Sequence, residues 1–378
     1  MRGRPGMMRL VRILRLASFV TSVCIAIAGC GSGGAPGSLP LTGARSVSVG
    51  ELHACAVLQD QTAVCWGLNS SGALGDGTTD LPTYPVAVKG LGGIAAIEAG
   101  DSRTCAIDGA GALSCWGSNV FGELASGPPS ISGTPTPAPV TTLSGSVSML
   151  VSTQHCVCAV LTSGTVECWG EDVLGLGAPD AVSIPPTPLP GLTNVRSLAL
   201  GDFFGCALLA DQTVSCWGSG ALGQADGTPL SVSRQPVGVP GLAGVVEISA
   251  GKSHACARMT DGTVKCWGSS VGFGLTLGPS PAMLSALAGA VSISSGGSST
   301  CAVLTGGAVR CLGPLGTGQG AVAGVSNATS VSVGTNFACA VISDGTVDCW
   351  GDASAAGLGD INRTEMSDSG VKVAAPSK

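Results

Sequence analysis

Short stretches in which hydrophobic and polar residues alternate recur along the whole chain. Residues 46–49 (Ser-Val-Ser-Val), 195–198 (Val-Arg-Ser-Leu) and 331–333 (Val-Ser-Val) follow this pattern, which is typical of half-buried β-strands. Each stretch leads into a pair of cysteines separated by turn residues, such as Asp-Gly at 261–262 and 344–345, and these residues favour tight β-hairpins. A short segment that often begins with proline comes next. The pattern therefore predicts units of four antiparallel strands.

The hairpin with its two cysteines is the repeating element of the chain. Its cysteines are always ten positions apart, and Trp-Gly follows the second cysteine in every copy but the sixth, where Leu312 replaces the tryptophan. Four short antiparallel strands per unit of this size are typical of a propeller blade. We therefore predict an all-β fold, a seven-bladed β-propeller of four-stranded antiparallel blades. The hairpins span residues 55–65, 105–115, 158–168, 206–216, 256–266, 301–311 and 339–349.

The two ends of the repeat array indicate how the ring closes. The first unit begins near Ser46 without the proline-led strand that should precede it, and residues 371–375 follow the last Trp-Gly where that strand would be expected. Pairing them would remove two exposed sheet edges. We therefore expect the propeller to span residues 45–375, with the ring closed by the C-terminal strand pairing with the first blade, and residues 376–378 to form a tail.

The N-terminal region has the composition of an export signal. Residues 1–15 contain five arginines and no acidic residue, and an apolar segment follows. That segment ends in Ile-Ala-Gly-Cys, which resembles a lipoprotein box in which the thiol of Cys30 is acylated. We expect residues 1–29 to be a lipoprotein signal peptide and residues 30–44 to be the lipidated cysteine and a flexible tether. Ordinary cleavage and an uncleaved anchor are the alternatives.

Charge and hydropathy bear on location and partners. Without the five arginines of the signal, the chain has 12 basic and 23 acidic residues, a net charge of −11, and such a domain is repelled by nucleic acid. No later run of apolar residues is long enough to span a membrane. We expect an exported protein, lipid-anchored to the cell envelope at the outer membrane or the cell surface, because Gly31 is not the aspartate that retains some lipoproteins in the inner membrane.

The cysteines fit a set of local disulfides. In a hairpin whose turn is at its midpoint, residues ten apart face each other, and export supplies an oxidising compartment. Zinc is not expected, because structural zinc sites need four closely spaced ligands. Cys156 is left over as a free thiol, with a bond to another molecule's thiol as the alternative. The expected pairs are Cys55–Cys65, Cys105–Cys115, Cys158–Cys168, Cys206–Cys216, Cys256–Cys266, Cys301–Cys311 and Cys339–Cys349.

One position of the repeat is a candidate binding face. It lies four residues before the first cysteine of each hairpin, so its seven residues share one phase and should encircle one face of the propeller. Phe203 and Phe204 would add an apolar spot there, and the long loops 118–138 and 171–189 are further candidates. Turn formation is the alternative role for all of them. The residues are Glu51, Asp101, Gln154, Asp202, Lys252, Gly297 and Thr335.

Known catalytic motifs are missing from the sequence. It contains no phosphate loop, dinucleotide fingerprint, serine nucleophile elbow or zinc-protease helix motif, and no cofactor is expected. His53 and His254 occupy a repeat position that varies freely in residue type, so we expect them to be structural. Asp76 and Asp226 precede glycines in loops, where they are expected to shape turns. A glycosidase-like pair of carboxylates remains open.

The repeating unit, Gly-x-x-His-x-Cys-Ala-x-x-x-Asp-Gly-x-Val-x-Cys-Trp-Gly, resembles the regulator-of-chromosome-condensation repeat, and its cysteine pairs resemble those of exported bacterial members of that family. The resemblance covers residues 45–375 and implies a closed seven-bladed propeller. Exported relatives include β-lactamase-inhibitory propellers, which bind a protein through one face. The resemblance therefore favours a monomeric, non-enzymatic envelope lipoprotein that binds an envelope or extracellular protein or glycan. A polysaccharide-acting enzyme, which carboxylates at the channel mouth would favour, and a structural surface protein are the alternatives.

Overall fold

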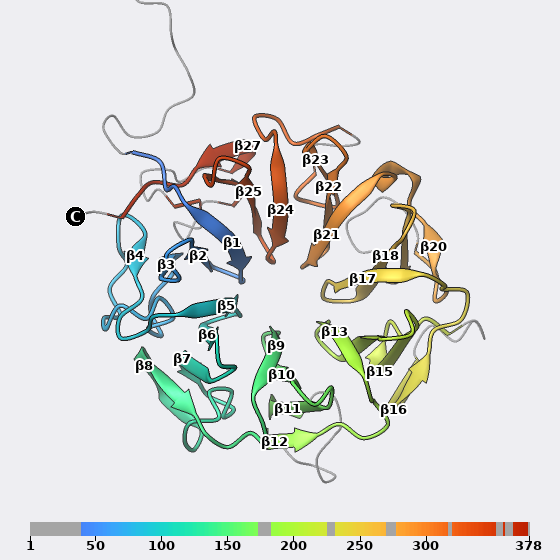
Figure 1. Ribbon diagram of the computed structural model, residues 1–378, viewed down its shortest axis with the longest axis horizontal. Coiled ribbons are helices and arrows are strands. Elements are labelled where there is room, and N and C mark those ends of the chain that lie inside the picture. The colour runs from blue at the N-terminus through green and yellow to red at the C-terminus, as the bar shows by residue number, and fades with distance from the viewer. Residues whose placement is uncertain are drawn as a thin grey trace, which may run out of the picture. The chain divides into compact units, whose positions relative to one another are not determined.

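The fold is a ring of seven antiparallel sheets (Figure 1). The computed structural model describes residues 39–172, 183–224, 231–269, 277–316, 320–352, 358–359 and 366–376, and the ring belongs to the unit formed by residues 34–378. No helix in these ranges is long and apolar enough to cross a membrane. The predicted all-β, seven-bladed propeller is confirmed. The predicted signal peptide and the lipid site at Cys30 lie outside the described residues.

Each blade is one repeat, and its strands are hydrogen-bonded in the order in which they occur along the chain. The sixth sheet has three strands, and a single bridge between Arg310 and Ala321 takes the place of its fourth. The strands are β1 (Ala44–Val49), β2 (His53–Leu58), β3 (Ala63–Gly67), β4 (Val86–Ala87), β5 (Ile94–Ala99), β6 (Arg103–Asp108), β7 (Leu113–Asn119), β8 (Ser130–Val140), β9 (Val147–Ser152), β10 (Cys156–Leu161), β11 (Val166–Glu171), β12 (Ser183–Pro188), β13 (Val195–Leu200), β14 (Phe204–Leu209), β15 (Val214–Gly220), β16 (Ser231–Gly238), β17 (Val245–Ala250), β18 (His254–Met259), β19 (Val264–Gly268), β20 (Ala282–Met283), β21 (Ala290–Gly296), β22 (Ser299–Leu304), β23 (Val309–Leu312), β24 (Ala328–Val333), β25 (Phe337–Ile342), β26 (Val347–Gly351) and β27 (Ser367–Lys372).

The central hairpin of every blade is joined by a disulfide. The two cysteines are direct partners in the antiparallel register, as Cys55 and Cys65 are between β2 and β3, so their side chains lie on the same side of the sheet. All seven expected disulfides are present, which confirms the pairing derived from the ten-residue spacing. Each loop closed by a disulfide lies within one blade, so no disulfide links two blades.

The predicted closure of the ring is wrong. The C-terminal strand β27 pairs with β26 in the last blade, and the first blade has its own outer strand, β4. The proline-led strand of a unit comes after the unit's own hairpin. The first blade is therefore complete without a strand from the C-terminus. The ends of the array meet just outside the sheets, where Pro40 bridges Ala374 and the Leu41 N–H donates to the Val373 carbonyl over 2.8 Å.

Neighbouring blades are joined through the tryptophan that follows the second cysteine. The side chain of Trp116 is fully buried, and its Nε1 donates to the Ala73 carbonyl in the loop of the preceding blade over 2.8 Å. Trp169 and Trp267 make the same bond to Glu123 and Ala221. The core is therefore divided into apolar clusters at the seams between blades, and a seam of this kind also lies between the last blade and the first.

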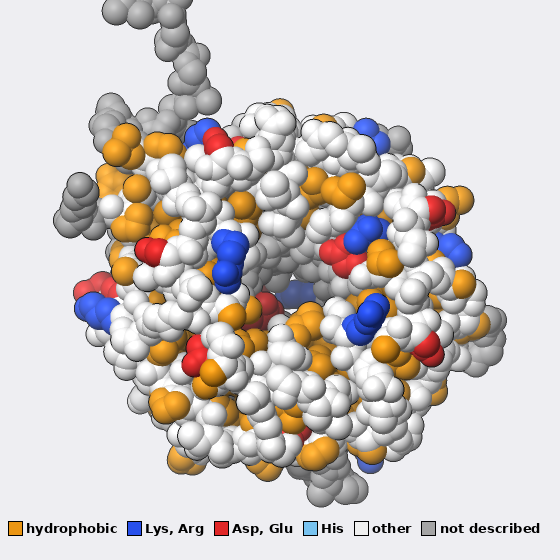
Figure 2. All heavy atoms as spheres, in the orientation of Figure 1, with side chains coloured by type: hydrophobic (Ala, Val, Ile, Leu, Met, Phe, Trp, Pro, Cys, Tyr) orange, Lys and Arg blue, Asp and Glu red, His pale blue; other side chains and the backbone are white. Residues whose placement is uncertain are grey.

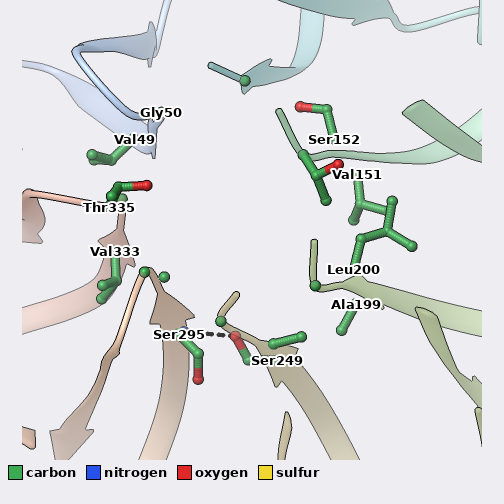
Figure 3. A pocket seen from close by; sticks show the side chains of 18 of the residues that line it. Val49, Gly50, Val151, Ser152, Ala199, Leu200, Ser249, Ser295, Val333 and Thr335 are labelled. Atoms are coloured by element: carbon green, nitrogen blue, oxygen red, sulfur yellow. Dashed lines mark hydrogen bonds between the residues drawn. The ribbon is translucent and has the colours of Figure 1, made fainter. Parts of the chain in front are cut away.

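A second contact joins the blades near the axis of the ring. Seven positions before the first cysteine, a serine on the inner strand accepts a hydrogen bond from a backbone N–H on the inner strand of the next blade. We call this contact the inter-blade latch; Figure 3 shows the one between Ser249 and Ser295. The latches are Ser48 with Ala99 (2.9 Å), Ser249 with Ser295 (2.7 Å), Ser294 with Val333 (3.0 Å) and Ser332 with Val49 (3.0 Å).

Candidate functional site

A cavity of about 270 Å³ lies at the centre of the ring, and every blade contributes to it. Figure 2 shows it as a hollow with charged side chains visible in its depth. Its wall carries apolar side chains from several blades, among them Val49, Leu200 and Val333 (Figure 3). The inner strands end around this cavity, so the residues that follow them are brought together although they are far apart in sequence.

One end of the cavity is lined by the seven residues that the repeat phase singled out. We call this set the mouth ring: Glu51, Asp101, Gln154, Asp202, Lys252, Gly297 and Thr335. Backbone hydrogen bonds between blades hold part of it in place. The N–H of Glu51 donates to the Gly100 carbonyl, that of Asp202 to the Lys252 carbonyl and that of Lys252 to the Gly297 carbonyl, over 2.8–3.3 Å.

The charged members of the mouth ring act on one another across the cavity. The pKa of Glu51 is raised to about 7, first by a hydrogen bond shared with the Asp101 carboxyl and then by burial, while Lys252 opposes the shift. The pKa of Asp202 is also raised by burial. Asp202 belongs to another blade than Glu51 and also raises the pKa of Glu51, which indicates that these groups face a common space.

Glu98, which the sequence analysis did not single out, is a fourth acidic group in the cavity. It occupies the latch position of the second blade, where its carboxylate accepts hydrogen bonds from Ser48 Oγ and from the Ser152 N–H, each at 3.3 Å. Burial raises its pKa to about 7. Its position seven residues before Cys105, where other blades carry serine, is the sequence signal that could have revealed it.

The two phenylalanines expected on this face differ in their exposure to solvent. Phe203 is 51% exposed and stacks on His155, with ring centroids 5.7 Å apart. Phe204 is only 1% exposed and packs in the core, so its assignment to the binding face is wrong. The reason is strand alternation: Phe204 begins β14 and points inward, whereas Phe203 precedes the strand. His155 Nδ1 also lies 2.5 Å from the Glu171 carboxylate.

The two histidines that were expected to be structural are buried between blades. Nε2 of His53 contacts Thr104 Oγ1, and Nε2 of His254 contacts Thr300 Oγ1, both at 2.8 Å. Burial lowers the pKa of each to about 4. In this environment both are neutral at physiological pH and have a structural role.

The equivalent position in the second blade holds Arg103, which is 2% exposed. Its guanidinium donates hydrogen bonds to the carbonyl oxygens of Thr153, Gln154 and Cys156 and lies 3.6 Å from the Glu123 carboxylate. Arg103 therefore fixes the loop that places Gln154 in the mouth ring. In the third blade the position is taken by Cys156, a buried free thiol whose pKa burial raises to about 11.

The remaining candidates add no reactive group to the site. The Asp76 carboxylate accepts bonds from the backbone N–H and hydroxyl of Thr78, which is the expected turn. Within the described ranges, no group of three or more His, Cys, Asp or Glu side chains is arranged to hold a metal ion. Asp226 and residues 173–182 of the long loop 171–189 lie outside those ranges, whereas residues 130–138 of the loop 118–138 are part of β8.

The repeats match known family models. The model described as "Regulator of chromosome condensation (RCC1) repeat" matches residues 44–73, 94–123, 195–224 and 245–274, and a second model with this description matches residues 65–107. Four of these matches begin at the first strand of a blade or next to it. The chain belongs to the RCC1-repeat family. No curated protein sequence matches this RCC1-repeat chain.

Solved structures share the fold of this RCC1-repeat chain. Prp20p of Saccharomyces cerevisiae, described with its binding properties to Gsp1p and histones, is 20% identical with a TM-score of 0.69, covering 82% of this chain and 85% of its own. Human WBSCR16 is 23% identical with a TM-score of 0.61 and coverages of 68% and 72%. The ectodomain of the Arabidopsis thaliana receptor kinase ACR4 is 20% identical, with a TM-score of 0.55 and coverages of 84% and 99%.

Proposed function

We propose that this protein is a non-enzymatic envelope lipoprotein whose propeller binds a partner protein through the mouth ring. The observation that carries the proposal is the convergence of side chains from all seven blades on one polar cavity. Apolar and polar groups gathered in a concave site are typical of ligand recognition. Binding of Gsp1p and histones by the similar Prp20p adds a precedent for protein partners on this fold.

The carboxyl groups at the mouth are the observation that favours a polysaccharide-acting enzyme instead. Glycosidases need two carboxyl groups about 5–5.5 Å apart for retention, or about 6.5–9.5 Å apart for inversion. Glu51 and Asp101 share a hydrogen bond, which places them closer together than either mechanism uses. A pair this close cannot admit a sugar ring or a water between its members, so Glu51 and Asp101 do not fit as the two carboxyl groups of a glycosidase.

The proposed location rests on the N-terminal sequence and on the disulfides. Seven disulfides in one ring suit an oxidising environment outside the cytoplasm. In the proposal, the thiol of Cys30 carries the lipid and residues 31–44 tether the propeller to the envelope. Such an anchor would hold the binding face near other envelope proteins.

Affinity capture tests the proposal. The oxidised full chain is immobilised and exposed to envelope and secreted fractions, and the eluates are examined by protein mass spectrometry and glycan analysis. We expect one protein in a near one-to-one ratio, and we expect it to be lost when bulky residues replace Thr335 and Gln154 of the mouth ring. Glycan fragments that shorten with time of contact would favour the enzyme instead, and recovery of no specific component would favour a structural protein.

A further inference from the structure

The direction of the inner strands gives the ring two different faces. Each inner strand ends at the mouth ring, as β1 does between Val49 and Glu51. At the other end, the carbonyl of the residue before the inner strand accepts a hydrogen bond from the backbone N–H of the turn between the two central strands, in all seven blades and over 2.8–3.1 Å. We call the face that these turns form the turn face. The donors are Gln59, Gly109, Thr162, Ala210, Thr260, Thr305 and Ser343.

The N-terminal segment joins the ring at the turn face. Ala44, the first residue of β1, donates its backbone N–H to the Gly345 carbonyl in the turn of the last blade over 2.9 Å. Before it, Leu41 is 2% exposed, and its N–H donates to the Val373 carbonyl. Figure 1 shows the blue segment before β1 meeting the red segment after β27. Residues 39–44 therefore enter at the rim of the turn face, on the side opposite the mouth ring.

The depth of the ring exceeds the average reach of the tether. A six-residue strand such as β1 spans about 20 Å, so the mouth ring lies about that far from the point where the chain enters. Residues 31–38 separate Cys30 from Leu39, the first described residue, and six of these eight are glycine or serine. A Gly/Ser-rich chain of this length has a root-mean-square end-to-end distance of roughly 14–17 Å. A mouth ring that faced the membrane would require this chain to cross the whole depth of the ring first.

We propose that the mouth ring is turned away from the membrane, and that its partner is a water-soluble protein that approaches from the aqueous side. This inference rests on the anchored binding module proposed above and adds the kind of partner that it takes. With the lipid on Cys30, the short tether holds the turn face towards the bilayer. A protein embedded in the same membrane would have to extend past the full depth of the ring to reach the mouth ring, whereas a soluble protein meets it directly.

Fluorescent labels on the two faces test this orientation. The full chain with Ser343→Cys on the turn face or Thr335→Cys in the mouth ring, both in the last blade, is purified from the membranes of expressing cells. Each protein is labelled with the same thiol-reactive dye and added to preformed vesicles that contain a headgroup-labelled acceptor lipid. We expect energy transfer from position 343 to be at least about twofold more efficient, because the length of a strand separates the two positions. Equal transfer from both, or stronger transfer from position 335, would overturn the inference.

A second pair of labels and a longer tether are the controls. Gln154→Cys and Ser163→Cys, at positions on the mouth ring and the turn face of the third blade, repeat the comparison if a variant of the last blade does not fold. The wild type, whose Cys156 is buried, measures background labelling. Inserting about twenty glycine and serine residues after Ser38 raises the root-mean-square length of the tether to roughly 30 Å, and it should bring the two transfer efficiencies together. An unchanged difference would contradict the role of the tether.

Mass spectrometry of the N-terminal peptide in the same preparation separates this inference from the proposed anchor. If Cys30 carries lipid and position 335 transfers energy as well as position 343, the lipoprotein stands and the orientation is wrong. If Cys30 carries no lipid and an uncleaved N-terminal segment holds the chain, stronger transfer from position 343 supports the orientation, and the lipoprotein is wrong. A chain that does not join the vesicles contradicts both.

The affinity capture described above tests the kind of partner. Soluble proteins are separated from membranes by centrifugation before capture, and we expect the captured protein to come from the soluble fraction. A captured protein that is embedded in the membrane fraction would overturn this part of the inference. Capture of no protein would contradict the proposed binding function, and the energy-transfer measurements would still decide the orientation.

Discussion

At the scale of single residues, the ring depends on glycines at the ends of its inner strands. A Cβ atom on Gly50 would lie 1.9 Å from the carbonyl oxygen of Gly100, and one on Gly334 would lie 2.0 Å from that of Gly50. Neither glycine has a positive φ angle, so the requirement is for space and not for an unusual backbone conformation. The sequence alone does not show this requirement, because the neighbouring blade that touches each glycine is about 50 positions or more away.

Gly334→Ala should therefore destabilise the protein by about 1–3 kcal/mol, the usual cost of overpacking a tight contact. Gly238→Ala is the matched control, because its φ angle is not positive and nothing lies within 4 Å of a Cβ atom there. Urea unfolding at neutral pH measures both. Equal midpoints for the two variants would contradict the steric explanation.

At the scale of the elements, the inter-blade latches show what a repeat phase can and cannot predict. Serine recurs seven positions before the first cysteine at four places, including Ser48 and Ser332, and this is visible in the sequence. Its hydrogen-bond partner lies on another blade, so the function of the position appears only in three dimensions. Val151 and Ala199 occupy it in the third and fourth blades, where no latch of this kind can form.

Ser332→Ala tests the latch between the last blade and the first. The substitution removes the acceptor for the Val49 N–H, and we expect a loss of about 1–2 kcal/mol in the free energy of unfolding, since a buried donor is left unpaired. Hydrogen exchange at the Val49 amide should become faster. Ser330→Ala, on the same strand, is the control and should leave that amide unchanged; equal protection of Val49 in both variants would argue against the latch.

At the scale of the whole molecule, two kinds of ionisable group make the stability of the folded state depend on pH in opposite directions. His53 and His254 have pKa values of about 4 instead of 6.5. The unfolded chain therefore binds protons first on acidification, and the folded state loses stability between pH 6.5 and 4. Glu51 and Glu98 have pKa values of about 7 instead of 4.5. Here the folded state binds protons first, and it gains stability as the pH falls from 7 to 4.5.

The Glu51→Gln/Glu98→Gln variant should show the pH dependence of stability that His53 and His254 cause without the two glutamates. We expect its free energy of unfolding to fall steadily on acidification from pH 6.5 to 4.5, a range in which the wild type changes much less because the two effects offset each other. Urea titrations at half-unit pH steps measure this, with Asp368→Asn as a control that keeps the wild-type profile. Identical profiles for the variant and the wild type would show that these carboxyl groups titrate normally.

Much of the architecture could be predicted because the same spacing of residues recurs in all seven repeats. The cysteine spacing predicted the hairpins and the disulfides, and the position four residues before the first cysteine predicted which residues meet at the mouth. The position of Phe204 could not be predicted, since one residue decides whether a side chain precedes the strand or lies within it. The hydrogen bond between Glu51 and Asp101 could not be predicted either, because it depends on side-chain conformations on two blades.

The meeting of the chain ends has a consequence for how the molecule can be rebuilt. Residues 39–41 and 373–375 are joined by backbone hydrogen bonds beside the seam between the last blade and the first, and every disulfide closes within its own blade. A short linker could therefore join these ends while the chain is cut between two other blades, giving a circular permutant with the same contacts. In such a molecule any blade can come first, and the mouth ring can be presented from a different point of attachment.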